Sequence, residues 1–134
     1  MLRFGFTVLA MSLLTLPVVS TAHAADNTSA FVAKWDTDHD GALDLTEVNR
    51  AADALFDKQD TDHDGTLDRK ELGRRVTGAE FTAADKDHDG TLDKAEFETI
   101  VAKRFHAANP DADTTIEASE LTTRSGKRLL LLLQ

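Results

Sequence analysis

The sequence predicts an all-α fold of helix–loop–helix repeats, arranged as a short bundle of three to five helices. One observation is a twelve-residue acidic pattern that begins at residues 36, 60, 85 and 109, so that successive copies start 24, 25 and 24 residues apart. The other is the length of the connectors between copies, which are 12, 13 and 12 residues long and carry apolar residues at helical spacing. Each connector therefore has room for about one helix, which leaves one loop and enters the next.

The first 24 residues have the pattern of a secretory signal peptide. Arg3 provides a positive charge, the residues that follow up to Val19 are mostly apolar, and Ala22-His23-Ala24 places small residues where a signal peptidase recognises them. We expect cleavage before Ala25, export to a bacterial periplasm, and a single domain over residues 25–134. An uncleaved membrane anchor is the alternative.

The composition excludes several classes of function. The 134 residues include 24 acidic and 15 basic side chains, a net charge of −9, and no cysteine. Disulfides, thiolate metal sites and cysteine nucleophiles are thereby excluded. The negative charge makes nucleic acids and, after signal cleavage, membranes poor partners, whereas cations are natural ones. We expect no enzyme, because the sequence has no glycine-rich phosphate loop, no zinc-protease signature and no nucleophile elbow.

Each copy of the acidic pattern resembles the calcium-binding loop of the EF-hand superfamily. Such a loop surrounds a hard cation with side-chain oxygens from positions 1, 3, 5, 9 and 12 and a backbone carbonyl from position 7. A glycine at position 6 permits the sharp turn that the loop makes at positive φ. Of the 24 acidic residues, 19 fall on ligand positions, so the acidity of the chain belongs to binding sites rather than to a solvated surface.

Three loops have this pattern in full. Their candidate ligands are Asp36, Asp38, Asp40, Ala42, Asp44 and Glu47 in loop one (36–47), Asp60, Asp62, Asp64, Thr66, Asp68 and Glu71 in loop two (60–71), and Asp85, Asp87, Asp89, Thr91, Asp93 and Glu96 in loop three (85–96). Position 8 is apolar in every loop, which allows a short strand there to pair with a partner loop.

The fourth loop (109–120) departs from the pattern. Its candidate ligands are Asn109, Asp111, Asp113, Thr115, Glu117 and Glu120. Asn109 replaces the first carboxylate, and Thr114 stands where glycine is needed, at a cost of about 1–2 kcal/mol if its φ is positive. We expect a weak or purely structural site.

The connectors predict which loops pair. Residues 48–59 and 97–108 should each form one unbroken helix, which holds its two loops at opposite ends. Gly73 and the capping-box pattern Thr77-Gly78-Ala79-Glu80 predict a bend in the second connector. Loop two should therefore fold back onto loop three, and loop one should pair with loop four.

The whole pattern is similar to the lanmodulin family, periplasmic lanthanide-binding EF-hand proteins of methylotrophic bacteria. The resemblance covers roughly residues 30–130 and rests on four loops with single-helix connectors, Asp at position 9 of the strong loops, and the sequence Ala108-Asn109-Pro110-Asp111. It implies lanthanide(III) ions as preferred ligands, ordering on metal binding, and a link to lanthanide uptake or delivery. Two features differ from the family pattern. Thr37, Thr61 and Lys86 stand where the family has proline at position 2, and histidine occupies position 4.

We therefore expect an exported carrier or buffer that binds lanthanide(III) and/or Ca²⁺ ions at three strong sites and one weak site. Two carboxylates about 5 Å apart repel by roughly 3 kcal/mol at an effective dielectric near 20, so binding and folding should be coupled. A calcium sensor or a dockerin-like interaction module is the alternative. The methionine-rich groove of promiscuous sensors is not expected, since Met1 and Met11 are the only methionines.

Two further features carry expectations. The position-4 histidines His39, His63 and His88 should point outward into solvent. The run Leu129–Leu133 is too short to span a bilayer and should cap the core, with a contact to a partner protein or a dimer contact as the alternative. A protein partner that receives the metal is left open.

Overall fold

The computed structural model describes residues 22–134, with side chains from residue 27 onward. Most of the predicted signal peptide therefore lies outside the described residues. The elements are α1 (Ala22–Trp35), β1 (Ala42–Asp44), α2 (Leu45–Gln59), α3 (Arg69–Leu72), α4 (Gly78–Ala84), α5 (Lys94–Ala108), β2 (Thr115–Glu117), α6 (Ala118–Leu121) and α7 (Arg124–Leu133). The all-α prediction is confirmed. Besides the helices, the described part of the chain has a single small sheet, formed by the two strands β1 and β2.

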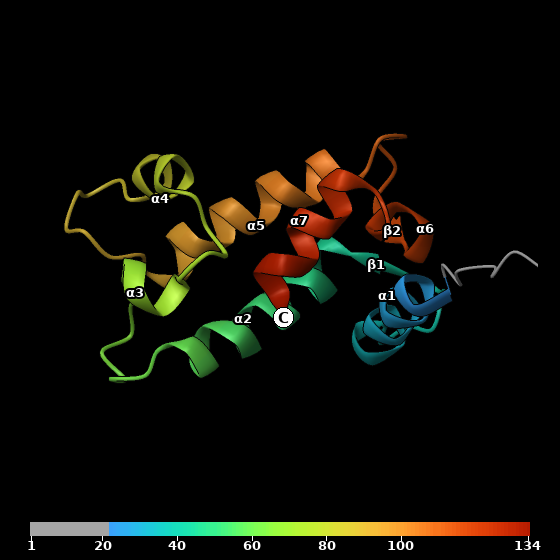
Figure 1. The fold of residues 1–134 in the computed structure, drawn as a ribbon, viewed down its shortest axis with the longest axis horizontal. Helices are drawn as coiled ribbons and strands as arrows, with labels where there is room; N and C mark the ends of the chain where they lie inside the picture. Colours follow the sequence, from blue (N-terminus) through green and yellow to red (C-terminus); the bar gives the residue numbers. More distant parts are fainter. Residues whose placement is uncertain (1–21) are drawn as a thin grey trace, which may run out of the picture.

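The two long helices α2 and α5 pack against each other, and α7 packs on α5 (Figure 1). At one end of this pair lie α1, α6 and the two strands, and at the other end lie α3 and α4. Phe56 of α2 meets Phe97 of α5 edge to face, with ring centroids 5.8 Å apart. The helices thus separate two pairs of loops, one at each end of the molecule.

The predicted loop pairing is confirmed. Strands β1 and β2 are antiparallel, and Leu43 lies opposite Ile116, which joins loop one to loop four. At the other end, Leu67 and Leu92 exchange both backbone hydrogen bonds, at 2.8 and 2.9 Å, which joins loop two to loop three. All four of these position-8 side chains are buried, so each loop pair is anchored in the core.

The connectors behave as predicted. Helices α2 and α5 are continuous, whereas the second connector divides into α3 and α4. Gly73 ends α3 at a φ of 54°, and Thr77 caps α4 in a capping box with Glu80. The described residues form seven helices rather than three to five, because the second connector holds two and Thr123 caps a further helix after α6. None of these helices combines the length and apolar character needed to cross a bilayer.

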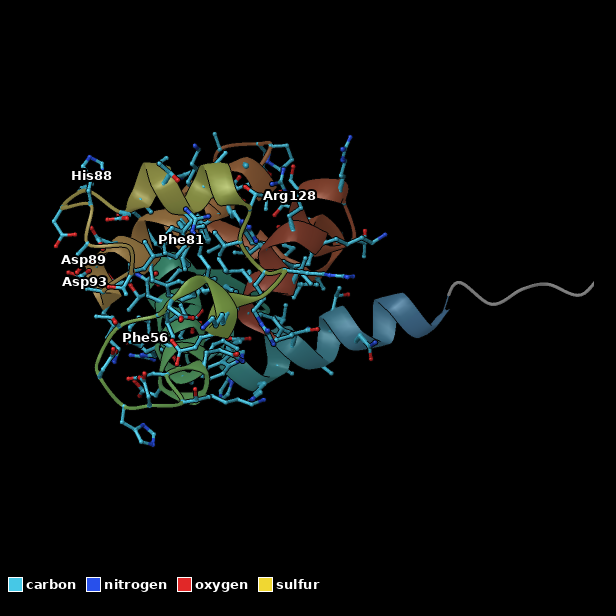
Figure 2. The ribbon with its side chains drawn as sticks, turned by 60° about the vertical axis from the view of Figure 1, so that its left-hand side comes forward. Phe56, Phe81, His88, Asp89, Asp93 and Arg128 are labelled. Atoms are coloured by element: carbon cyan, nitrogen blue, oxygen red, sulfur yellow. The ribbon has the colours of Figure 1, made fainter. Side chains whose placement is uncertain are left out.

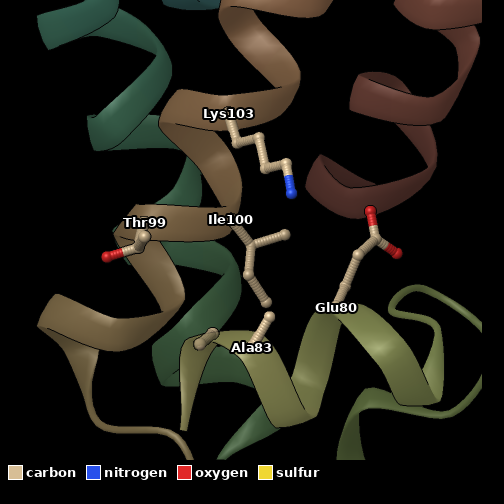
Figure 3. A pocket seen from close by; sticks show the side chains of 6 residues that line it. Glu80, Ala83, Thr99, Ile100 and Lys103 are labelled. Carbon is tan, nitrogen blue, oxygen red and sulfur yellow. The ribbon is translucent and has the colours of Figure 1, made fainter. Parts of the chain in front are cut away.

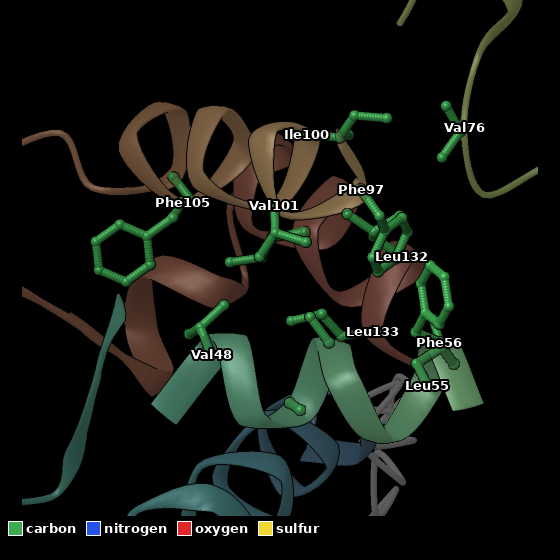
Figure 4. Close-up of a cluster of buried hydrophobic side chains, with 14 of the residues drawn as sticks. Val48, Leu55, Phe56, Val76, Phe97, Ile100, Val101, Phe105, Leu132 and Leu133 are labelled. Carbon is green, nitrogen blue, oxygen red and sulfur yellow. The ribbon is translucent and has the colours of Figure 1, made fainter. Parts of the chain in front are cut away.

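The core lies between α2, α5 and α7 (Figure 4). Leu129, Leu132 and Leu133 of the C-terminal run are buried in it, which confirms that the run caps the core. Leu131 is the exception, with 54 % of its surface exposed. The Arg75 guanidinium also donates to the Gln134 carbonyl oxygen, at 2.8 and 3.2 Å, and so ties the end of α7 to the bent connector.

Candidate metal centre

Acidic side chains converge in the first three loops. The sets are Asp36, Asp38 and Asp40 in loop one, Asp60, Asp62 and Glu71 in loop two, and Asp85, Asp87 and Glu96 in loop three, and in each the ligand oxygens lie within 4.8 Å of one another. Two oxygens on opposite sides of a hard cation, each about 2.4 Å from it, are separated by about this distance. The spacing therefore fits a cation of the calcium or lanthanide type.

A buried carboxylate oxygen supports the same fit. Asp85 is 7 % exposed, and its Oδ1 atom has no hydrogen-bond partner. A buried anionic oxygen without a donor is costly unless a cation or a donor satisfies it. A cation at the centre of loop three would supply that partner.

The structure brings together some predicted ligands more closely than others. Positions 1 and 3 belong to all three sets, position 5 joins in loop one, and position 12 joins in loops two and three. The position-9 carboxylates belong to none of the sets, and neither do the residues of loop four. The ligand roles of all the candidate residues remain predictions.

The position-9 residues have a second role that the sequence analysis missed. Asp44, Asp68 and Asp93 each cap the helix that follows the loop, accepting a hydrogen bond from the position-12 N–H at 2.8–2.9 Å. The Asp-x-x-Glu spacing of a capping box was present in the sequence. One oxygen of each aspartate is thus used by the helix, and the other is left for a cation or a bridging water.

The position-12 glutamates close the loops. Glu47 Oε1 accepts from the Thr37 N–H at 2.6 Å, and Glu47 Oε2 accepts from the Asp44 N–H at 3.1 Å. Glu71 and Glu96 make the same two contacts in loops two and three. Each glutamate therefore joins the start of its loop to the end, with both oxygens held in place.

These hydrogen bonds stabilise the charged form of the glutamates. Burial works against the charge of Glu47, but the bonds from Thr37 and Asp44 outweigh it and lower the pKa of this side chain. The N–H groups of Asp68 and Thr61 likewise lower the pKa of Glu71. Two of the three loop-closing carboxylates are therefore held ionised, ready for a cation.

Mutual repulsion acts elsewhere in loop one. The Asp40 N–H stabilises the charge of Asp38, yet burial and the nearby charges of Asp40 and Glu47 together raise the pKa of Asp38. For Asp36 burial is again unfavourable, but the N–H groups of Gly41 and His39 prevail and lower its pKa. Like charges in one loop thus compete with backbone donors, and a cation would relieve that competition.

The backbone turns at two positions in each strong loop. Position 6 is glycine at φ of 86–89°, and in all three loops its N–H donates to the position-1 carboxylate at 3.0–3.2 Å. Position 4 also has positive φ, at 62° for His39, 59° for His63 and 60° for His88, which the sequence analysis did not predict. The three histidines are exposed, as expected, and Figure 2 shows His88 on the outer side of its loop.

Loop four has a different turn, which corrects one expectation. Thr114 is not among the residues with positive φ, and within this loop only Ala112, at 58°, has that conformation. The predicted strain at Thr114 is therefore wrong. The loop avoids it with a hydrogen bond from Asn109 Nδ2 to the Asp113 carbonyl oxygen at 2.9 Å, which replaces the glycine N–H contact of the other loops.

Loop four also lacks one contact to its position-12 glutamate. Position 2 is Pro110, which has no N–H to donate, so among the described hydrogen bonds the Glu120 carboxylate accepts only from the Glu117 N–H, at 3.0 Å. Burial, together with the charges of Asp111, Glu117 and Asp113, raises the pKa of Glu120. Asn109 Oδ1 is buried without a partner, so the loop keeps an oxygen for a weak site.

Comparison with protein families identifies the two central loops. The EF hand family model matches residues 52–76 and 79–101, each of which contains one acidic loop and parts of the helices on both sides. These two segments are therefore similar to EF hands. Loop one closes with the same glycine and glutamate contacts as the two matched segments. No curated protein matches the chain.

The matches to the EF hand family and the acidic clusters together indicate binding of calcium or a similar metal ion. Carboxylate and carbonyl oxygens suit hard cations rather than the soft or borderline metals that cysteine binds.

Proposed function

We propose that the protein is an exported carrier or buffer for hard cations, lanthanide(III) or Ca²⁺, held in loops one to three, and that it is not an enzyme. The observation that carries the proposal is the convergence of carboxylate oxygens within 4.8 Å in three loops. In each loop a position-12 glutamate is already held at both oxygens by backbone N–H groups.

The charge of each loop favours a trivalent ion. Loops one to three each have five carboxylates on ligand positions, and their attraction to an ion grows with its charge. Ca²⁺ and the lanthanides both bind hard oxygen ligands, so the protein would hold either. The five carboxylates of each loop therefore favour lanthanide(III) ions over Ca²⁺.

The described part of the protein exposes few large apolar side chains, which favours a carrier or buffer over a promiscuous sensor. A sensor opens a methionine-rich groove when calcium binds, and no methionine lies among the described residues. Within that part of the chain, Leu131 is the one large hydrophobic side chain that is exposed. The other large apolar side chains in this part are buried or partly buried.

Terbium luminescence tests the choice of ion. Trp35 is half-buried and directly precedes Asp36, so it should sensitise terbium bound in loop one. We expect micromolar terbium to give strong emission that millimolar calcium does not displace. Ready displacement by calcium would contradict the lanthanide preference and leave a calcium-binding protein.

A variant separates binding from sensitisation. Trp35→Phe should lose the emission while it still binds terbium in loops one to three, as measured by calorimetry. Loss of the emission in Asp36→Asn, with Trp35 intact, should instead reflect weaker binding in loop one.

Export has its own test. Expression of the full chain in a Gram-negative bacterium, followed by fractionation, should place the protein in the periplasm with Ala25 as its first residue. A cytoplasmic protein that begins at Met1 would contradict export without affecting metal binding.

A further inference from the structure

The exposed side of α7 is basic, although the protein as a whole is acidic. Arg124, Lys127, Arg128 and Leu131 are all exposed, and their spacing of three and four residues places them on one side of the helix. Lys103 of α5 lies beside them, because it lines the same cavity as Arg128. We call Lys103, Arg124, Lys127 and Arg128 the basic face.

Glu80 lines the same cavity as Lys103 and Arg128, and its charge is compensated by the buried Arg104. The buried Arg104 binds both oxygens of Glu80, at 3.0 and 3.1 Å, and Arg128 reaches the same carboxylate at 3.4 Å. The Arg104 guanidinium also donates to the carbonyl oxygens of Arg75 and Arg128, both at 2.7 Å. Glu80 is therefore neutralised by Arg104, and the face keeps an excess of positive charge.

Three of the four cations have no acidic partner. Among the described ion pairs, Lys103, Arg124 and Lys127 form none, and Arg128 forms only the one with Glu80. Figure 3 shows Lys103 of α5 and Glu80 of α4 extending toward the same space beside α7.

Helix stability does not explain these residues. Positive side chains are favourable near the C-terminal end of a helix and unfavourable near the N-terminal end. Arg124, Lys127 and Arg128 occupy the first half of α7, whose last turn has no basic residue. The placement runs against the helix dipole, which points to a role outside the helix itself.

We propose that the basic face docks an acidic segment of a partner protein. The chain has a net charge of −9, so an acidic partner is repelled by the chain as a whole and attracted where exposed cations gather, as they do on the basic face. If the protein hands its ion to an acceptor, which rests on the proposed carrier function, that acceptor must itself be rich in carboxylates. The basic face gives such a partner a place to bind.

The shape of the face favours carboxylate side chains over a lipid surface. Lys103, Ser125 and Arg128, together with the paired Glu80 and Arg104, line a cavity of about 130 Å³, which is large enough for one further carboxylate group. Glu80 shows how a carboxylate sits here between two guanidinium groups. Leu131 lies on the same side of α7 and offers an apolar contact next to the charges.

A labelled hexa-glutamate peptide tests the docking by fluorescence anisotropy. The full chain is saturated with Ca²⁺ and titrated at low salt. We expect saturable binding that weakens as salt is added. Because the metal sites are filled throughout, the result does not depend on whether calcium or a lanthanide is the preferred ion, and terbium titration of the same sample reports the metal sites separately.

Matched variants locate the binding. Lys103→Gln/Lys127→Gln removes two cations of the face that have no ion-pair partner, and we expect the peptide affinity to fall about fivefold or more. Lys58→Gln/Lys70→Gln makes the same charge change elsewhere and should alter the affinity less than about twofold. Lys103→Arg/Lys127→Arg keeps the charge and should bind like the parent protein.

Three outcomes would overturn the proposal. They are the absence of peptide binding to the parent protein, an equal loss in the face variant and the control variant, and face-dependent binding to vesicles of phosphatidylglycerol and phosphatidylcholine in the absence of peptide binding. The last outcome would assign the face to a membrane instead.

Discussion

Thr37 and Glu47 close loop one from its two ends. The Thr37 N–H donates to Glu47 Oε1 at 2.6 Å, and the Thr37 hydroxyl donates to the same oxygen at 2.9 Å. In loop four the corresponding pair is Pro110 and Glu120, and the proline has no N–H to offer. The pKa of Glu47 is lowered, whereas that of Glu120 is raised.

Thr37→Pro should make Glu47 more like Glu120. Losing both donors leaves burial and the Asp36 charge less opposed, so the pKa of Glu47 should rise. Thr37→Ala keeps the N–H and should cause a smaller rise. Because protons compete with the cation for Glu47, the pH at which terbium emission from loop one is half lost should rise with this pKa, and terbium titrations over a range of pH compare the two variants. Equal midpoints in the two variants would show that the N–H is unimportant.

The strand pair should couple loop four to loop one. Ile116 is fully buried opposite Leu43, so Ile116→Ala should cost about 2–5 kcal/mol and weaken terbium binding in loop one, although Ile116 is not a ligand. Leu131→Ala, at an exposed position, should change the free energy of unfolding by less than about 0.5 kcal/mol. Denaturant titration of the metal-loaded proteins measures the stabilities. Undiminished terbium emission in Ile116→Ala would contradict the coupling.

Two glycine-to-alanine substitutions should destabilise the protein for different reasons. A Cβ on Gly126 would lie 2.2 Å from the Glu120 carbonyl oxygen, so Gly126→Ala should separate α6 from α7 and cost about 3 kcal/mol or more. A Cβ on Gly41 would meet nothing within 4 Å, so Gly41→Ala should cost only the strain of its φ of 89°, about 1–2 kcal/mol. Thermal melts of the metal-loaded variants compare them. A larger loss in Gly41→Ala would contradict the close contact at Gly126.

The ion pair of Glu80 should give stability that acid removes. Burial opposes the charge of Glu80, but hydrogen bonds from Arg104 and Thr77 lower its pKa from 4.5 to about 2. Because the folded pKa is depressed, the contribution is complete above about pH 4.5 and disappears as the pH falls toward 2. Glu80→Gln should therefore be less stable than the parent by about 3 kcal/mol at neutral pH.

Melts of the two proteins from pH 7 to pH 3 test this prediction. Both proteins lose bound metal alike as the pH falls, so the difference between their melting temperatures isolates Glu80. That difference should narrow below about pH 4.5. A constant difference over the whole range would show that the charge of Glu80 contributes nothing.

The sequence was sufficient where a feature depends on local spacing. Gly73 and the Thr77-to-Glu80 capping box predicted the bend between α3 and α4, and the bend in turn predicted which loops pair. The periodic apolar residues of α2 and α5 likewise predicted two continuous helices. These features need few contacts from distant parts of the chain.

Features that depend on three-dimensional contacts were not predicted. The four hydrogen bonds of Arg104 to Glu80, Arg75 and Arg128 join segments 24 to 29 residues apart, and no sequence motif predicts them. The positive φ of His39, His63 and His88 was not predicted, because these positions do not hold glycine. Thr114 showed the opposite error, because the side chain of Asn109 gave loop four another way to turn.

Circular dichroism of the chelator-stripped protein tests most directly whether cations hold the carboxylate clusters together. We expect weak helical signal without metal, followed by a rise in helicity and in melting temperature that is complete at about three terbium or calcium ions per chain. Full helicity in the stripped protein, with no gain in signal or heat resistance when either ion is added, would contradict metal-dependent ordering of the loops.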